Sequence, residues 1–375
     1  MKHRFAVLDI FRGIFSSLVV LFHMSAFSDT AIINNKFIYN SDLFVDFFFV
    51  LSGFVITYSY QSISTGQEFG QFYKKRFFRL YPLHLIVLIL FVGIELSKHS
   101  ASGYVHVNKI ENISNNLQTF ITNIFLVNSV GFPGIHDVSW NIASWSISAE
   151  MIAYMVFGLV MLLINRISFA KNRLLLPVLV IFTASAILFF NTGSFKLDYN
   201  FDFGFLRGIV GFFVGVICFN TFDALKNQLF KLGSTLFTFL EIVLLIVVIG
   251  FVWQGAVYKN LGFIYEILFF ATILVFAFEK GWLSEQLKKS NFLHQTGKYS
   301  YSIYMIHTLI LSLFNIAFIR VLKFPPSAYA YLFILNYAII YFASAWTYKN
   351  IEMRFNNLGK AKINKEKLIT AEKIG

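Results

Sequence analysis

The sequence predicts an all-α integral membrane protein with about ten transmembrane helices and no soluble domain. Hydrophobic residues make up 57% of the 375 residues and charged residues only 13%, whereas soluble domains carry roughly 25% charged residues and about 45–50% apolar ones. Apolar runs of about 20 residues, the length that crosses a bilayer core, recur along the whole chain. Basic residues are concentrated in every second connecting segment, as expected for a multi-span protein.

About ten apolar runs are long enough to span a membrane. They begin near Leu8, Leu43, Tyr81, Ser146, Leu174, Gly204, Leu236, Leu261, Tyr299 and Ala328. The third run starts with Tyr81-Pro82, and proline is tolerated in the first turn of a helix. The basic N-terminus leads into an apolar run as a signal peptide would, but no small-residue cleavage site follows that run. We therefore expect the first run to be a retained span.

Lysine and arginine set the expected orientation. They cluster in segments 2–4, 74–79, 166–173, 226–231, 280–298 and 349–373, and the intervening segments hold few of them. Because basic residues mark the cytoplasmic side, both termini are predicted to be cytoplasmic, which requires an even number of spans. The net charge of +12 thus follows from membrane topology and does not indicate a nucleic-acid partner.

The chain is predicted to form one membrane domain, residues 1–355, followed by a basic cytoplasmic tail, residues 356–375. We interpret this tail as a topology anchor or a lipid-headgroup contact.

The long outer segment 97–144 contains an apolar piece, 120–132, that is too short to span and is expected to cap an outward-facing site. One cysteine allows no intrachain disulfide, and the histidines lack metal-ligand spacing, so no metal site is predicted.

The first span carries three ionisable residues, each of which is costly in hydrocarbon unless it faces the protein interior. Asp9 and Arg12 are three residues apart, so they can pair, either as a structural ion pair or as part of a site. Arg12 and His23 are eleven residues apart, which places them on one helix face about 16 Å from each other along the axis. This face would line a path for a long molecule with a negatively charged end.

The second span and the segment after it add further candidates. Asp46 begins the second span at the expected depth of His23, where a carboxylate would orient an imidazole. Ser52-Gly53 favours close helix packing or close approach of a ligand. Arg76 and Arg79 lie one helical turn apart at the cytoplasmic face, as a topology anchor or as a clamp for phosphate groups.

Polar residues also mark later spans. Trp145-Ser146 opens the fourth span at the outer interface, and Glu150 lies one turn deeper, near the expected depth of His23. Arg207 enters the sixth span from the same side and is placed to neutralise a carboxylate.

The ninth span is more polar than its neighbours and carries Tyr301 and His307. Two further intramembrane acids, Glu241 and Glu266, have no role that the sequence suggests.

The order and depth of these residues resemble the acyltransferase-3 family of bacterial inner-membrane acyltransferases. The resemblance covers residues 5–354 and is carried by Arg12 to His23, Val45-Asp46 with Phe48 to Phe54, Arg76 to Arg79, Trp145-Ser146 with Glu150, and Gly297 to His307. Each element alone is weak, but together and in order they are specific.

The resemblance implies ten spans and transfer of an acyl group, most often acetyl, from cytoplasmic acyl-coenzyme A. The implied acceptor is a hydroxyl of an extracytoplasmic glycan or lipid-linked sugar, such as O-antigen or exopolysaccharide. Acyl-coenzyme A would be a co-substrate, and no permanently bound cofactor is expected. Homo-oligomers are compatible with the sequence, which does not select the acceptor or the acyl group.

The expected roles follow the depth of each residue. Arg76 and Arg79 would hold donor phosphates, with Arg12 deeper along the same path. His23 would act as general base, oriented by Asp46 or Glu150, or as a nucleophile that forms a transient acyl-histidine. Substrate-binding or supporting roles are expected for Ser52, Trp145, Ser146, Arg207, Tyr301 and His307.

The alternative function is a transporter or flippase, because intramembrane Arg, Asp and His often serve proton or anion movement. Transporters often show inverted repeats and broken helices. The two halves of the chain show no clear repeat, and the paired cytoplasmic arginines suit a donor with a nucleotide end.

Overall fold

The computed structural model describes residues 4–103, 112–166 and 173–372, and within these residues every regular element is a helix. Nine helices of the described part are long and apolar enough to cross a membrane, or ten if one bent pair counts as a span. The predicted all-α membrane fold is confirmed. Parts of the basic segments 2–4, 166–173 and 349–373 lie outside the described residues.

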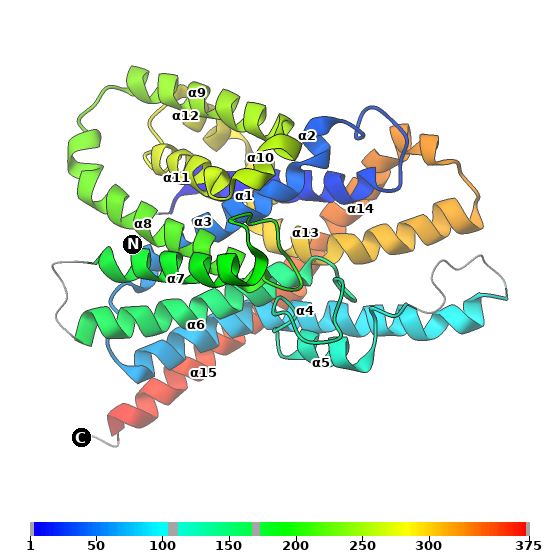
Figure 1. Cartoon of the computed structure of the whole chain (residues 1–375), viewed down its shortest axis with the longest axis horizontal. Coiled ribbons are helices and arrows are strands. Elements are labelled where there is room, and N and C mark those ends of the chain that lie inside the picture. The colour runs from blue at the N-terminus through cyan, green and yellow to red at the C-terminus, as the bar shows by residue number, and fades with distance from the viewer. Residues whose placement is uncertain (1–3, 104–111, 167–172, 373–375) are drawn as a thin grey trace.

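The long helices run side by side, and both termini lie at the same end of the bundle (Figure 1). They are α1 (Ala6–Ser25), α3 (Phe44–Tyr60), α4 (Gly66–Ala101), α6 (Ser144–Arg166), α7 (Leu175–Thr192), α8 (Gly204–Leu229), α9 (Ser234–Trp253), α13 (Asn291–Asn315) and α14 (Tyr329–Thr347). The shorter helices are α2 (Lys36–Tyr39), α5 (Leu117–Ile124), α10 (Gly255–Tyr258), α11 (Ile264–Phe276), α12 (Trp282–Lys289) and α15 (Met353–Glu372).

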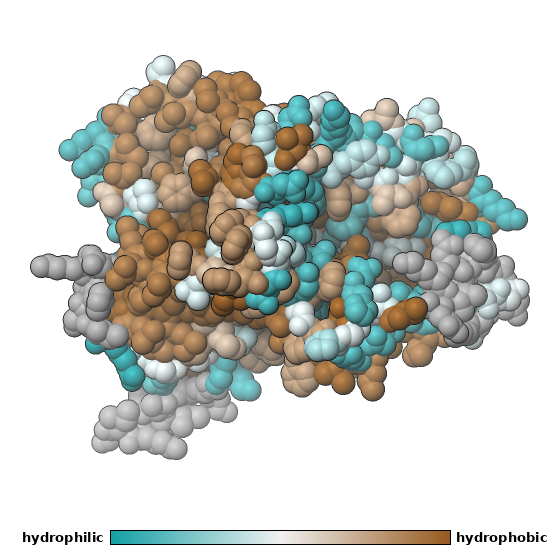
Figure 2. Space-filling model, viewed as in Figure 1, coloured by the Kyte–Doolittle hydropathy of each residue, from teal (hydrophilic) through white to brown (hydrophobic). Residues whose placement is uncertain are grey.

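The outer surface of the bundle is suited to lipid. Figure 2 shows a broad hydrophobic face over α7, α9 and α11, with hydrophilic residues gathered toward the ends of the helices. Phe182 and Phe190 on α7 and Phe239 and Ile246 on α9 are among the exposed large hydrophobic side chains of these helices. Since lipid tails solvate such side chains, the exposed apolar band marks the membrane-embedded part of the protein.

The third span differs from its predicted boundary. It does not begin at Tyr81, and Pro82 is not in a first turn, because α4 starts at Gly66 and continues through the proline. Thr65 and Glu68 form a reciprocal capping box that starts the helix on the side predicted to be cytoplasmic. The basic run 74–79 is therefore helical and rigidly attached to the transmembrane part.

The eighth span is broken. Gly262 adopts a left-handed φ of +59° between α10 and α11, and the two segments are bent by 100°. A Cβ atom at Gly262 would come within 2.4 Å of the Phe195 carbonyl oxygen, so glycine is needed for both conformation and space. The ninth span also starts earlier than predicted, at Asn291, where Ser290 caps α13.

Two very close helix contacts determine which spans are neighbours. Gly13 of α1 faces Gly297 of α13, and a Cβ at Gly13 would lie 2.5 Å from the Gly297 nitrogen. Gly53 of α3 faces α8, and a Cβ there would lie 1.8 Å from the Phe212 carbonyl oxygen. The packing role expected at Gly53 is confirmed, since small residues let helix backbones approach. These contacts bring α1 beside α13, and α3 beside α8.

The outer segment before α6 packs against the helix ends. The Asn141 side chain donates to the Met305 carbonyl oxygen at 3.0 Å and accepts from Thr308 Oγ1 at 2.7 Å, both on α13. His84 of α4 contacts the Asn123 carbonyl oxygen at the end of α5, with Nε2 2.9 Å away. The segment is thus fixed to the outer half of α4 and α13, close to His307.

Candidate active site

A pocket with an empty volume of about 800 Å³, including open solvent, lies among α1, α3, α4, α6 and α13. The lining residues are Arg12, Val45, Phe48, Phe49, Leu51, Ser52, Val55, Ile56, Arg76, Arg79, Leu80, Ser146, Ile147, Glu150, Tyr154, Ser300, Tyr301 and Tyr304. Seven of the predicted site residues line this one pocket.

The end of the pocket that is predicted to be cytoplasmic holds all three predicted arginines. Arg12 pairs with Asp9 at 3.6 Å, which confirms the pairing expected from their spacing. Arg76 Nη2 donates to the Tyr60 hydroxyl at 3.3 Å, and its Nε is buried without a hydrogen-bond partner in the described part of the chain. Arg79 Nε lies 3.8 Å from a carboxylate oxygen of Glu352, a residue that the sequence analysis did not single out. Three guanidiniums that line one pocket form a favourable site for phosphate groups.

The middle of the pocket contains a hydrogen-bonded carboxylate. Ser52 Oγ donates to Glu150 Oε1 at 2.6 Å, and the Tyr154 hydroxyl donates to the same oxygen. Ser52 and Glu150 were predicted site residues, and the structure joins them. Tyr154 was missed, although its position four residues after Glu150 on the same helix face was a usable signal.

The outward end of the pocket is closed by hydroxyl and aromatic groups. Ser146 Oγ lies 2.8 Å from the Tyr304 hydroxyl, and the Phe48 ring meets the Tyr304 ring edge-on at 6.0 Å. Tyr301 donates to the Leu80 carbonyl oxygen at 2.5 Å, which ties α13 to α4. Tyr304 was not among the predicted site residues, and it separates the pocket from the histidines described next.

Beyond Tyr304, two histidines from different spans contact each other. His23 Nδ1 lies 3.2 Å from His307 Nε2 and 3.0 Å from the Val19 carbonyl oxygen. His307 is fully buried, and its Nδ1 lies 2.7 Å from the Tyr304 carbonyl oxygen. His23 is half-buried. The pair therefore lies between the pocket and the outer side of the bundle.

The hydrogen-bond partners assign the tautomers of the neutral pair. A carbonyl oxygen only accepts, so His307 Nδ1 carries its proton and His307 Nε2 is an acceptor. His23 Nδ1 then donates toward His307 Nε2 and the Val19 carbonyl oxygen. This leaves the lone pair on His23 Nε2, where a general base needs it.

The predicted contact between His23 and a carboxylate is wrong. Asp46 instead forms a two-point ion pair with Arg207, with Nε–Oδ1 and Nη2–Oδ2 distances of 2.6 and 2.8 Å. Glu150 is held by Ser52, as described above. Similar depth in the membrane did not imply contact, because α3 directs Asp46 toward α8 whereas α1 directs His23 toward α13. The predicted role of Arg207 in neutralising a carboxylate is confirmed.

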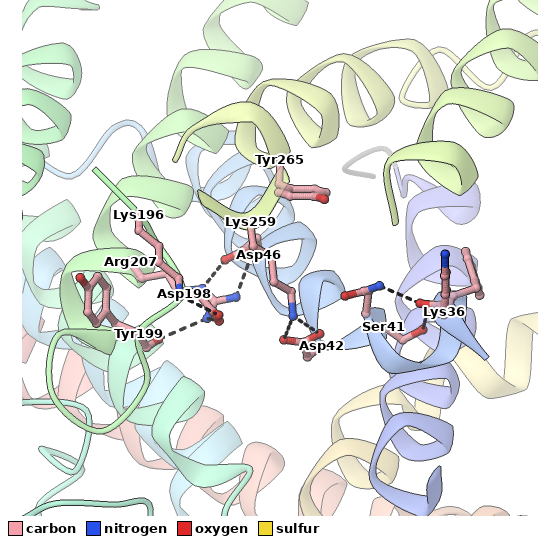
Figure 3. A network of polar contacts seen from close by, with 12 residues as sticks. Lys36, Ser41, Asp42, Asp46, Lys196, Asp198, Tyr199, Arg207, Lys259 and Tyr265 are labelled. Carbon is pink, nitrogen blue, oxygen red and sulfur yellow. Dashed lines mark hydrogen bonds and ion pairs between the residues drawn. The ribbon is translucent and has the colours of Figure 1, made fainter. Parts of the chain in front are cut away.

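The Asp46–Arg207 pair belongs to a larger outer network (Figure 3). The Arg207 guanidinium lies over the Trp145 ring at 5.3 Å and also approaches Asp198 at 3.6 Å. Nearby, Lys259 Nζ binds the carboxylate of Asp42 at 2.8 Å. These contacts tie the outer loops before α8 and α11 to the start of α3, and they give Trp145 and Arg207 a structural role.

The two remaining intramembrane acids differ from each other. Glu241 accepts from the backbone nitrogens of Gly281 and Ser284, each at 3.0 Å, at the N-terminal end of α12. It therefore anchors that helix. Glu266 is 1% exposed, and both its oxygens lack hydrogen-bond partners among the described residues.

The fold and pocket define a multi-pass membrane protein with a cation-lined cavity inside its helical bundle. The chain matches the family model described as an acyltransferase domain over residues 5–346. It belongs to the acyltransferase-3 family. The match ends before α15 begins.

Two curated relatives are similar to parts of the chain. An uncharacterized protein of Haemophilus influenzae is 30% identical over 152 residues, which is 39% of this chain and 57% of the relative. Protein 2 in the picA locus of Rhizobium radiobacter is 40% identical over 91 residues, 23% of this chain and 44% of the relative. The chain thus spans about half the length of the curated relatives it matches. No solved structure matches it.

Proposed function

We infer that this protein transfers an acyl group, in the first place acetyl, from cytoplasmic acyl-coenzyme A to a hydroxyl group on the outer side of a bacterial inner membrane. The acceptor is a glycan or a lipid-linked sugar, such as O-antigen or exopolysaccharide. The observation that supports this function is the pocket itself, which has three arginines at its cytoplasmic end and ends outward at Tyr304, next to the paired histidines.

The donor fits this pocket by its chemistry. The phosphates of coenzyme A suit the guanidiniums of Arg76 and Arg79. The pantetheine arm then lies along the largely apolar wall formed by residues such as Phe48 and Val55. The thioester reaches the outward end, where the hydroxyl group of Tyr304 is available to its carbonyl oxygen.

The transfer step uses His23 as general base. His23 Nε2 takes the proton of the acceptor hydroxyl while the hydroxyl oxygen attacks the thioester carbonyl carbon. The new ester C–O bond forms, the C–S bond breaks, and the proton passes from His23 to the leaving thiolate, which gives free coenzyme A. His307 holds the His23 ring and its tautomer throughout. An acyl-histidine route would use the same Nε2 atom as nucleophile.

The first experiment measures donor binding. Purified protein in detergent is titrated with acetyl-coenzyme A by calorimetry, beside an Arg76→Ala/Arg79→Ala variant. The expected result is binding by the wild type and a loss of at least about tenfold in affinity for the variant, because two charge-assisted phosphate contacts disappear.

An Arg166→Ala/Arg173→Ala variant is the matched control. It removes the same charge from the same side of the membrane, but neither arginine lines the pocket. Equal losses in the two variants would show a nonspecific charge effect. A folded wild-type protein that binds neither acetyl- nor other acyl-coenzyme A would contradict the proposed donor and favour the transporter.

A further inference from the structure

A second pocket opens where α15 crosses the cytoplasmic base of α4. It has an empty volume of about 830 Å³, including open solvent, and it is lined by Tyr60, Lys75, Arg76, Arg79, Asn356, Lys360 and Asn364. Arg76 and Arg79 also line the first pocket. These two arginines therefore lie between the two pockets.

The position of α15 is determined by specific packing. A Cβ at Gly359 would lie 2.7 Å from the Phe78 Cβ, so the two helices are in close contact at this point. Ile363, one turn further along α15, is 1% exposed. A helix held this closely against α4 presents Asn356, Lys360 and Asn364 along one face, since they are four residues apart. That face forms the second wall of the pocket.

A π-helical turn leads into α15 and contributes a contact of its own. The turn Tyr348–Glu352 places the Glu352 side chain inside the bundle, 5% exposed. There it accepts from Ser302 at 3.3 Å and pairs with Arg79 at 3.8 Å. Inserted π turns often occur at functional sites. Here the turn fixes the orientation of an arginine that both pockets share.

The charge of the second pocket indicates what it binds. Four of the seven lining side chains are cationic, two are amides, and none is a carboxylate. The Arg76 guanidinium also lies over the Tyr60 ring at 5.3 Å, which holds it at the pocket wall. Such a set suits a ligand with several phosphate groups, because each phosphate oxygen can accept from a guanidinium or ammonium donor.

We propose that α15, which lies outside the matched family domain, completes the binding site for the nucleotide end of the donor. The 3′-phosphate and pyrophosphate of coenzyme A would bind between Lys360 on α15 and the basic face of α4, and the pantetheine arm would enter the first pocket past Arg79. This proposal rests on the proposed donor and adds a subsite with Lys360 as its specificity-determining residue.

The test separates the nucleotide end from the rest of the donor. Calorimetry on the full-length protein measures binding of adenosine 3′,5′-bisphosphate, acetyl-coenzyme A and S-acetylpantetheine. In Lys360→Glu, affinity for the two nucleotides should fall about tenfold, because one phosphate contact is replaced by repulsion. Affinity for S-acetylpantetheine should not change. Lys360→Arg should retain nucleotide binding.

Lys362→Glu is the matched control, because it reverses the same charge two residues away on an exposed part of α15 that lines neither pocket. Equal effects of Lys360→Glu and Lys362→Glu would refute the subsite while leaving acyl-coenzyme A as donor. Absence of adenosine 3′,5′-bisphosphate binding in a wild type that binds acetyl-coenzyme A would also refute it. Equally effective competition by glycerol 1-phosphate would assign the pocket to lipid phosphates. If the wild type bound no acyl-coenzyme A, the proposed donor itself would fail.

Discussion

The contact between His23 and His307 leads to a graded prediction about catalysis. His23 Nδ1 has two acceptors, His307 Nε2 at 3.2 Å and the Val19 carbonyl oxygen at 3.0 Å. His23→Ala removes the base and should lower the transfer rate by about 10²–10⁴-fold. His307→Ala removes only one of the two acceptors, worth about 0.5–1.5 kcal/mol, so a loss of about two- to twelvefold is expected.

The assay uses inverted membrane vesicles, whose cytoplasmic face is exposed to added acetyl-coenzyme A. It measures the transfer of labelled acetyl groups to glycans on the opposite, lumenal side. His84→Gln is a suitable control, because His84 is also fully buried and bonded to a carbonyl oxygen but does not line the pocket. It should keep wild-type transfer. Equal losses for His307→Ala and His23→Ala would show that His307 takes part in the chemistry itself. Wild-type transfer by His307→Ala would refute the positioning role.

Three further predictions concern other contacts. Asp46→Asn should lower the free energy of unfolding by up to about 3–5 kcal/mol, because the buried Arg207 loses its two-point ion pair and keeps only Asp198, at 3.6 Å, among its carboxylate partners in the described residues. Thermal unfolding in detergent measures this, and an unchanged midpoint would contradict it. Gly53→Ala should prevent close packing of α3 on α8 and yield little folded protein by size-exclusion chromatography, whereas normal yield would show that the helices can separate. Glu352→Gln should weaken acetyl-coenzyme A binding about two- to fivefold, because Arg79 loses its ion pair and is held less firmly, while thermal stability stays unchanged. Wild-type affinity in calorimetry would show that Glu352 does not position Arg79.

Much of the fold and part of the site followed from local sequence properties. Apolar run length determines how many helices can cross the bilayer, because each must satisfy its own backbone hydrogen bonds within the hydrocarbon. Helical spacing placed Arg12 beside Asp9 and put Arg76 and Arg79 on one face. The boundaries were less predictable where polar helix continues beyond the membrane, as in α4, whose start depends on the Thr65 cap rather than on hydropathy.

Only tertiary packing decided which transmembrane helices lie next to each other. Depth along a span is readable from sequence, but the direction that a side chain faces depends on which helix lies next to it. The glycine contacts at Gly13 and Gly53 place α1 against α13 and α3 against α8, so His23 meets a histidine and Asp46 meets an arginine.

The residues that sequence reasoning missed share this origin. Tyr154 contacts Ser52 of α3, Glu352 pairs with Arg79 of α4, and Lys360 of the basic tail lines a pocket together with residues of α4, so each of these contacts joins residues far apart in the sequence. Composition and spacing thus determined that this is a multi-span protein with basic groups at one face and a histidine near the other. Packing of helices far apart in sequence decided which of those groups share a cavity. Two spans become neighbours because their surfaces fit together, and this fit does not depend on how close the spans are along the chain.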